Sequence, residues 1–132
     1  MKGIDTNVLL RYLTQDTPKQ SRLATRFIED GCSAKSPGIV NHIVLCELVW
    51  TLQAVFDRTQ NDIINIIENL LAIDQLEIID SDLVHRALAD YKKSNAGFAD
   101  HLLARVNEAH GCKTTVTFDK KAAKNSAFEI LT

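Results

Sequence analysis

The chain has 132 residues, of which 45% are hydrophobic and 24% charged, a balance that favours one compact domain, 1–132, over a disordered chain. The formal net charge of −2 excludes the strongly basic surface of proteins that bind nucleic acid through overall charge, so any such contact must be local. Without a long apolar run or a signal-peptide layout, we expect a cytoplasmic protein with no membrane segment.

The cysteines and histidines offer no soft-metal site. The three cysteines are widely spaced and form no CxxC pair, so we expect free thiols in a reducing compartment. The four histidines have no metal-ligand spacing, and we interpret them as structural or surface residues.

The chain opens with a short strand at 1–4 that runs through Asp5 into a helix. Thr6 or Asn7 can cap this helix by accepting its free N–H groups, which leaves Asp5 without a necessary structural role. Taken alone, Asp5 is equally well explained as a second capping or turn acid.

The rest of the chain alternates between helical and extended patterns. In the first part we expect a helix from Pro18 to Gly31, a short strand within 32–40, an apolar helix within 39–56 and an amphipathic helix at 60–73. In the second part we expect a strand at 76–80, helices from 81 and from 98, a strand at 113–118, a helix from 120 and a strand at 128–131. This alternation predicts an α/β fold with a mostly parallel sheet and helices on both faces.

Glu47 is the most unusual acid because its neighbours on the predicted helix are almost all apolar. An ionised carboxylate in such surroundings needs a base or a cation beside it. The alternative is a residue at the helix edge whose carboxylate reaches solvent.

Three other acids stand where strands end or helices begin: Asp5, Asp100 and Asp119. Each can be explained by the helix dipole or by capping. Because ligand sites in parallel α/β folds gather at the carboxyl ends of the strands, these acids and Glu47 are expected to share one edge. A site built only from carboxylates favours Mg²⁺, with Mn²⁺ as a substitute, over zinc.

Several other side chains have both a structural and a functional interpretation. Lys120, Lys121 and Lys124 follow Asp119 where a helix start usually carries acids, which hints at a nearby negatively charged ligand. A solvated lysine-rich face is the simpler alternative. The aromatic residues Trp50, Phe56 and Phe98 are interpreted as core residues, although they could line a partner groove.

Four short motifs in this order resemble the PIN-domain ribonucleases, and specifically the VapC toxins of type II toxin-antitoxin pairs. The matching stretches are IDTNVLLRYL from Ile4, ELVW from Glu47, FAD from Phe98 and TFDKKA from Thr117. The resemblance covers nearly the whole chain. It implies a three-layer α/β/α fold around a five-stranded sheet of order 3-2-1-4-5.

The resemblance also implies a function. The protein would be a metal-dependent endoribonuclease that inhibits translation and growth when free of its antitoxin, and it would form a homodimer. Asp5, Glu47, Asp100 and Asp119 would be both catalytic residues and metal ligands. Thr6, Asn7 and Thr117 would support them. Lys120, Lys121, Lys124 and Arg11 would be candidate contacts for RNA phosphates.

Two other functions share these sequence features. A phospho-acceptor signalling domain has the same size and an acidic edge, but it usually carries adjacent acids after the first strand, where this chain has only Asp5. A non-catalytic domain that binds RNA or protein could keep the fold, although it would not need the intact set of acids.

Overall fold

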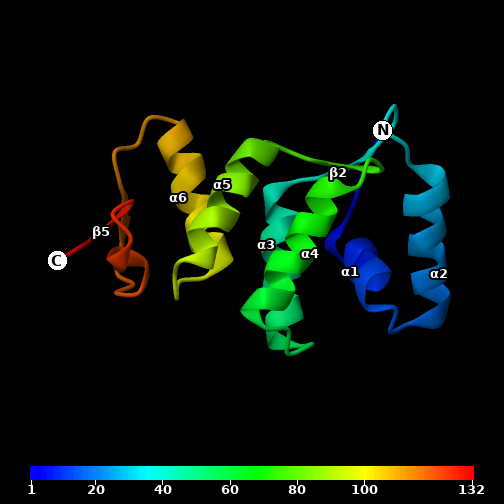
Figure 1. Cartoon of the computed structure of the whole chain (residues 1–132), viewed down its shortest axis with the longest axis horizontal. Helices are drawn as coiled ribbons and strands as arrows, with labels where there is room; N and C mark the ends of the chain where they lie inside the picture. Colours follow the sequence, from blue (N-terminus) through cyan, green and yellow to red (C-terminus); the bar gives the residue numbers. More distant parts are fainter. The chain divides into compact units, whose positions relative to one another are not determined.

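The computed structural model describes all residues, 1–132, as two compact units, Met1–Ile79 and Asp80–Thr132, and each unit is described by itself (Figure 1). None of the helices combines the length and the apolar composition needed to cross a membrane. All three cysteines are free thiols.

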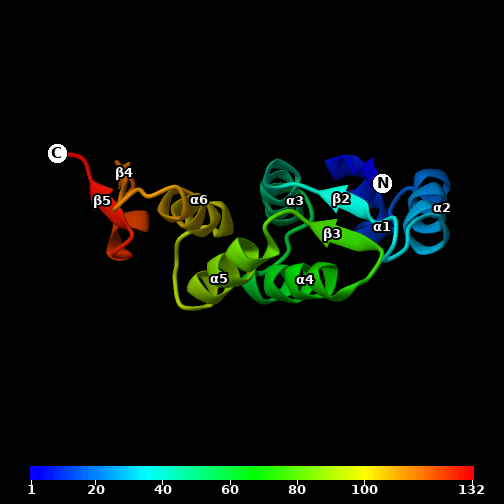
Figure 2. The same cartoon turned by 90° about the horizontal axis from the view of Figure 1, so that it is seen from above.

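The first unit is a parallel sheet with helices packed around it. Its strands are β1 (Lys2–Gly3), β2 (Gly38–Val40) and β3 (Leu76–Ile78), with β2 in the middle and all three parallel. Its helices are α1 (Thr6–Thr14), α2 (Pro18–Arg26), the π-helical turn η1 (Phe27–Gly31), α3 (His42–Ala54) and α4 (Gln60–Ala72). Figure 2 shows α4 alongside β3.

The core of the first unit comes from the apolar faces of these helices. Leu9, Leu45, Leu48, Ile63 and Ile67 have relative exposures of 1% or less. The amphipathic pattern correctly predicts α4, whose buried side carries Ile63, Ile67 and Leu70.

One tight contact fixes the start of the chain against the sheet. The backbone N–H of Ile4 donates to the carbonyl oxygen of Ile39 at 2.9 Å, which continues the pairing of β1 with β2. Across this pair, Gly38 faces the side chain of Ile4 so closely that a Cβ atom at Gly38 would overlap the Ile4 side chain. The absence of a side chain at Gly38 therefore leaves room for the Ile4 side chain, just before Asp5.

The second unit holds two helices and a pair of strands. The elements are α5 (Ser81–Lys92), α6 (Phe98–Ala109), β4 (Thr115–Thr117), the 3-10 turn η2 (Ala122–Lys124) and β5 (Phe128–Ile130), with β4 parallel to β5. Helices α5 and α6 pack side by side in Figures 1 and 2, and Arg105 of α6 donates two hydrogen bonds to the Asp90 carboxylate, at 2.7 and 2.9 Å.

The strand pairs agree with the expected order, because β3-β2-β1 and β4-β5 are neighbours within their units. The expected helix from Lys120 is wrong: this stretch forms only the 3-10 turn Ala122–Lys124. The backbone is already extended at Asn125, and β5 begins at Phe128, so too few residues remain for a longer helix.

Candidate metal centre

Asp5 marks the junction between β1 and α1. Its Oδ1 accepts a hydrogen bond from the backbone N–H of Thr6 at 2.7 Å, and Asp5 itself is the N-cap of α1. The expectation that Thr6 or Asn7 caps the helix is therefore wrong, because the helix already includes both residues. Asp5 is exposed, and Oδ2 has no hydrogen-bond partner, so capping leaves half of this carboxylate available.

Thr6 connects two of the candidate acids. While its N–H binds Asp5, its buried hydroxyl donates to Oε1 of Glu47 on α3 at 3.1 Å. Asp5 and Glu47 thus lie on either side of one residue, although they are far apart in the sequence. Asn7, the next residue of α1, is exposed and forms no hydrogen bond through its side chain.

Glu47 lies on the exposed side of α3, so the expectation of a carboxylate enclosed by apolar neighbours is wrong. Its neighbours Val44 and Leu48 are buried, but Ile43 and Trp50, on the same side as Glu47, are 70% and 68% exposed. The helix is apolar on all sides, and only one side packs into the core. The case for Glu47 as a ligand therefore rests on its bond with Thr6 and not on desolvation.

The three aromatic residues interpreted as core differ in how far they are buried. Trp50 is exposed, so its interpretation as a core residue is wrong. Phe98 is 1% exposed and is confirmed as core, while Phe56 is half-buried.

Asp100 lies in the first turn of α6 in the second unit. Its Oδ2 accepts a hydrogen bond from the backbone N–H of Gly97 at 3.2 Å, which stabilises the helix start. The side chain is half-buried, and Oδ1 has no hydrogen-bond partner. As with Asp5, one oxygen supports the helix and the other is available.

Asp119 follows β4 and organises the turn after it. Its Oδ1 accepts hydrogen bonds from the backbone N–H groups of Lys121 at 2.8 Å and Ala122 at 3.4 Å. The Thr117 hydroxyl accepts a hydrogen bond from the backbone N–H of Asp119 at 3.0 Å, so Thr117 holds the residue that carries the carboxylate. No hydrogen bond links Asp119 to Asp100.

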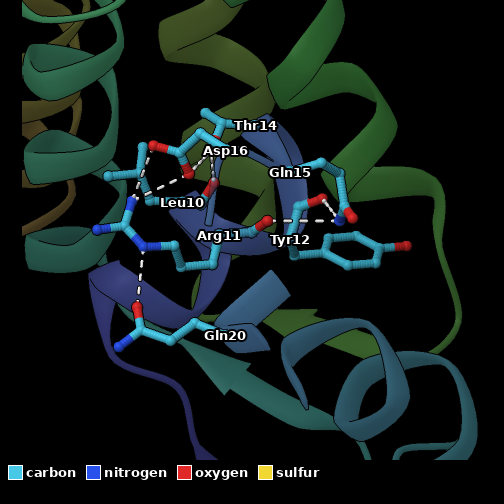
Figure 3. A network of polar contacts seen from close by, with 7 residues as sticks. All are labelled: Leu10, Arg11, Tyr12, Thr14, Gln15, Asp16 and Gln20. Carbon is cyan, nitrogen blue, oxygen red and sulfur yellow. Dashed lines mark hydrogen bonds and ion pairs between the residues drawn. The ribbon is translucent and has the colours of Figure 1, made fainter. Parts of the chain in front are cut away.

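The candidate RNA contacts differ in exposure and in whether their charge is already paired within the fold. Lys120, Lys121 and Lys124 are exposed beside Asp119. Arg11 is half-buried and already paired: Figure 3 shows its guanidinium between Asp16, at 3.2 Å, and the side-chain oxygen of Gln20, at 3.0 Å. The hydrogen bond from the Thr14 hydroxyl lowers the pKa of Asp16, and the nearby Arg11 charge lowers it further, so the partner of Arg11 stays ionised.

The donor set fits a hard divalent cation. Asp5, Asp100 and Asp119 each keep a carboxylate oxygen that is not used within the fold, and Glu47 uses only Oε1. Carboxylate oxygens are the ligands that Mg²⁺ prefers, together with several waters. Within either unit, no three His, Cys, Asp or Glu side chains come close enough to share an ion. Each unit by itself therefore offers two of the candidate ligands.

Comparison with known proteins identifies the family. The family model of the PIN domain matches residues 3–127, which is nearly the whole chain. The chain belongs to the PIN domain family. Membership confirms the expected three-layer α/β/α fold class. This PIN domain is also similar to a VapC ribonuclease of Aquifex aeolicus (strain VF5), with 26% identity over 124 residues that cover 94% of this chain and 91% of that protein.

The sequence did not single out Asn125, which contacts the buried His101 beside Asp100. No local pattern could have identified it, because the contact joins residues 24 positions apart.

Proposed function

We propose that this PIN domain is a metal-dependent endoribonuclease that acts as the toxin of a toxin-antitoxin pair. The observation that carries the proposal is the hydrogen-bonded arrangement of Asp5, Thr6 and Glu47, in which one residue orients two acids from distant segments of the chain. Membership of the PIN domain family and similarity to a VapC ribonuclease support the nuclease activity and the toxin role.

In this proposal, residues 1–132 act as one domain, and Asp5, Glu47, Asp100 and Asp119 together bind Mg²⁺ or Mn²⁺. When bound, the ion would lower the pKa of a coordinated water and neutralise charge on the scissile phosphate. The family match spans residues 3–127 and therefore includes all four acids.

The protein's own residues have distinct parts in this proposal. The hydroxyl of Thr6 fixes the orientation of Glu47, and the backbone N–H of Thr6 fixes that of Asp5, so neither carboxylate must be ordered when the ion binds. Thr117 instead holds the backbone of Asp119, while the N–H groups of Lys121 and Ala122 fix the orientation of its carboxylate. Asn7 lies next to the Asp5–Thr6 pair and completes the supporting set.

Contacts with RNA come from a local basic group in the proposal. Lys120, Lys121 and Lys124 surround Asp119 and would bind phosphates of the substrate. Arg11 contributes less, because its charge is balanced by Asp16.

The biological role includes two protein partners. A cognate antitoxin would block the acidic site, and the free protein would form a homodimer in the cytoplasm and inhibit translation by cutting RNA. The similarity to a VapC ribonuclease supports the antitoxin partner and the RNA substrate, and the homodimer, the location and the effect on translation are parts of the proposal.

The first experiment is calorimetry of Mn²⁺ binding to purified, antitoxin-free protein, followed by incubation of cellular RNA with Mg²⁺ or Mn²⁺. Asp5→Asn should abolish cleavage. Asp82→Asn is the matched control, because Asp82 is also an exposed acid at the start of a helix, α5, but lies outside the proposed site. Chelation of the metal should stop the wild-type reaction.

Three results would contradict the proposal in different ways. If the wild type binds no Mn²⁺, the acids act only as caps and surface groups. Mn²⁺ binding without cleavage of any RNA would favour a non-catalytic domain. Equal cleavage by wild type and Asp5→Asn would point to a contaminating nuclease.

A further inference from the structure

His101 is a fully buried polar residue next to Asp100 on α6. Its relative exposure is 0%. The Nε2 atom has no hydrogen-bond partner. Nδ1 lies 3.5 Å from the side-chain nitrogen of Asn125.

The hydrogen bonds of Asn125 determine which way its amide points. Its Oδ1 accepts a hydrogen bond from the backbone N–H of Ala127 at 2.9 Å, which leaves the amide nitrogen as the donor toward His101. Nδ1 of His101 is then the acceptor, and the proton of the neutral ring is assigned to Nε2.

Asn125 belongs to the same hydrogen-bonded turn as Asp119. Its backbone N–H donates to the carbonyl oxygen of Ala122 at 3.0 Å, and the N–H of Ala122 donates to Oδ1 of Asp119. Ala122 is itself buried against Ala104 of α6. The contact between His101 and Asn125 therefore joins the first turns of α6, which carry Asp100, to the turn that carries Asp119.

Packing alone does not explain a histidine at this position. A leucine would fill similar space without leaving a buried N–H group unpaired, and such groups cost stability. What the histidine supplies and the leucine lacks is the Nδ1 acceptor for Asn125.

We propose that His101 and Asn125 are positioning residues that hold Asp100 and Asp119 in the relative placement needed to bind one cation. This inference rests on the proposed function, because it assumes that both acids are ligands. Neither residue touches the ion; both act through the segments that carry the acids. Such outer groups commonly tune metal affinity.

The test measures Mn²⁺ affinity by calorimetry and thermal stability by circular dichroism in the full chain. His101→Leu should keep or raise the melting temperature, because it removes the unpaired N–H, but weaken Mn²⁺ binding by about tenfold or more. His101→Gln keeps an acceptor and should restore most of the affinity. A purely structural role for His101 would lower the melting temperature and leave the Mn²⁺ affinity of the folded protein unchanged.

A second pair of variants keeps the test decisive if His101→Leu fails to fold. Asn125→Ala removes the donor to His101 from a half-buried position. Asn107→Ala is its matched control, because Asn107 is also half-buried and links α6 to β4 through a 3.0 Å hydrogen bond to Thr115, near the other end of the helix. Only Asn125→Ala should weaken Mn²⁺ binding.

The outcomes separate this inference from the proposed function. Wild-type affinity in both His101→Leu and Asn125→Ala would overturn the positioning role and leave the metal site intact. Equal weakening by Asn125→Ala and Asn107→Ala would overturn it as well, since any loosening of α6 would then suffice. If wild-type protein binds no Mn²⁺, both the proposed function and the positioning role fail.

Discussion

The Thr6 hydroxyl donates to Oε1 of Glu47 across 41 residues of sequence, while the backbone N–H of the same threonine donates to Asp5. A buried threonine thus orients two carboxylates that are themselves exposed. The contribution of the bond between Thr6 and Glu47 can be measured by substitution of Thr6.

Thr6→Val keeps the shape of the side chain but removes the hydroxyl. We expect a loss of about 1 kcal/mol in the free energy of unfolding, as for a typical hydrogen bond, together with weaker Mn²⁺ binding because Glu47 is no longer oriented. Urea denaturation and calorimetry measure the two effects. Thr6→Ser retains the hydroxyl and should restore Mn²⁺ affinity; if Thr6→Val binds Mn²⁺ as tightly as wild type, Thr6 does not support the site.

Asp5 caps α1 and is a proposed metal ligand, and two substitutions can separate these roles. Asparagine caps helices about as well as aspartate, so Asp5→Asn should leave the free energy of unfolding nearly unchanged while RNA cleavage is lost. Asp5→Ala should in addition lose about 1 kcal/mol of stability, because α1 loses its cap. A large loss of stability in Asp5→Asn, seen by urea denaturation, would show that the charge is needed for folding and not only for metal.

The ion pair between Arg105 and Asp90 ties α6 to α5. It is partly exposed but bidentate, and we expect Arg105→Met to lower the free energy of unfolding by about 1 kcal/mol. The hydrogen bond with Asp90 also raises the pKa of Arg105, so the pair stays charged over the working pH range. Thermal unfolding in low and high salt should show a smaller difference between variant and wild type at high salt, and no salt dependence would contradict the expectation.

His101 predicts a dependence of stability on pH. Burial lowers the pKa of His101 in the folded state below the ordinary 6.5. Asp90 and Asp100 act in the opposite direction, and the charge of Arg105 lowers the pKa further. Between the two pKa values the unfolded chain binds more protons, so stability rises with pH there and is lost as the pH falls below about 6.5. Metal-free wild type should lose more stability than His101→Leu between about pH 7 and pH 5.5. Parallel curves for the two proteins would show that other groups cause the loss.

Trp50 offers a direct optical test of the exposed side of α3. It is the only tryptophan in the chain and is 68% exposed. Its fluorescence should have the emission of a water-exposed indole and be quenched readily by acrylamide in dilute protein. Emission typical of a buried indole at every concentration would contradict the exposed placement, whereas protection that grows with concentration would place this side of α3 in a dimer contact.

The predictions of secondary structure succeeded where the pattern of apolar residues was clear. The amphipathic repeat at 60–73 corresponds to α4, which spans Gln60–Ala72, because a single buried stripe identifies both the helix and its buried side. For α3 the sequence identified the helix but not its orientation. Apolar residues surround it on all sides, so nothing local indicates that Ile43, Glu47 and Trp50 face outward.

In the candidate site, too, local features could be predicted from the sequence and tertiary contacts could not. Asp5, Thr6 and Asn7 are adjacent and all suited to capping, so the capping residue depends on where the strand ends and could not be read from residue type. Tertiary contacts such as Thr6 with Glu47 join distant segments and leave no trace in the local pattern. Asp5, Asp100 and Asp119 could be singled out because they stand where strands end or helices begin, and their role as ligands stays a prediction.

The close approach of Gly38 to Ile4 has a genetic consequence. Any substitution at Gly38 adds at least a methyl group where the Ile4 side chain lies, so this side chain, which immediately precedes Asp5, must move. If the protein is a growth-inhibiting nuclease, cells that survive its unrestrained expression should carry inactivating alleles not only at the acids but also at this glycine, on the neighbouring strand.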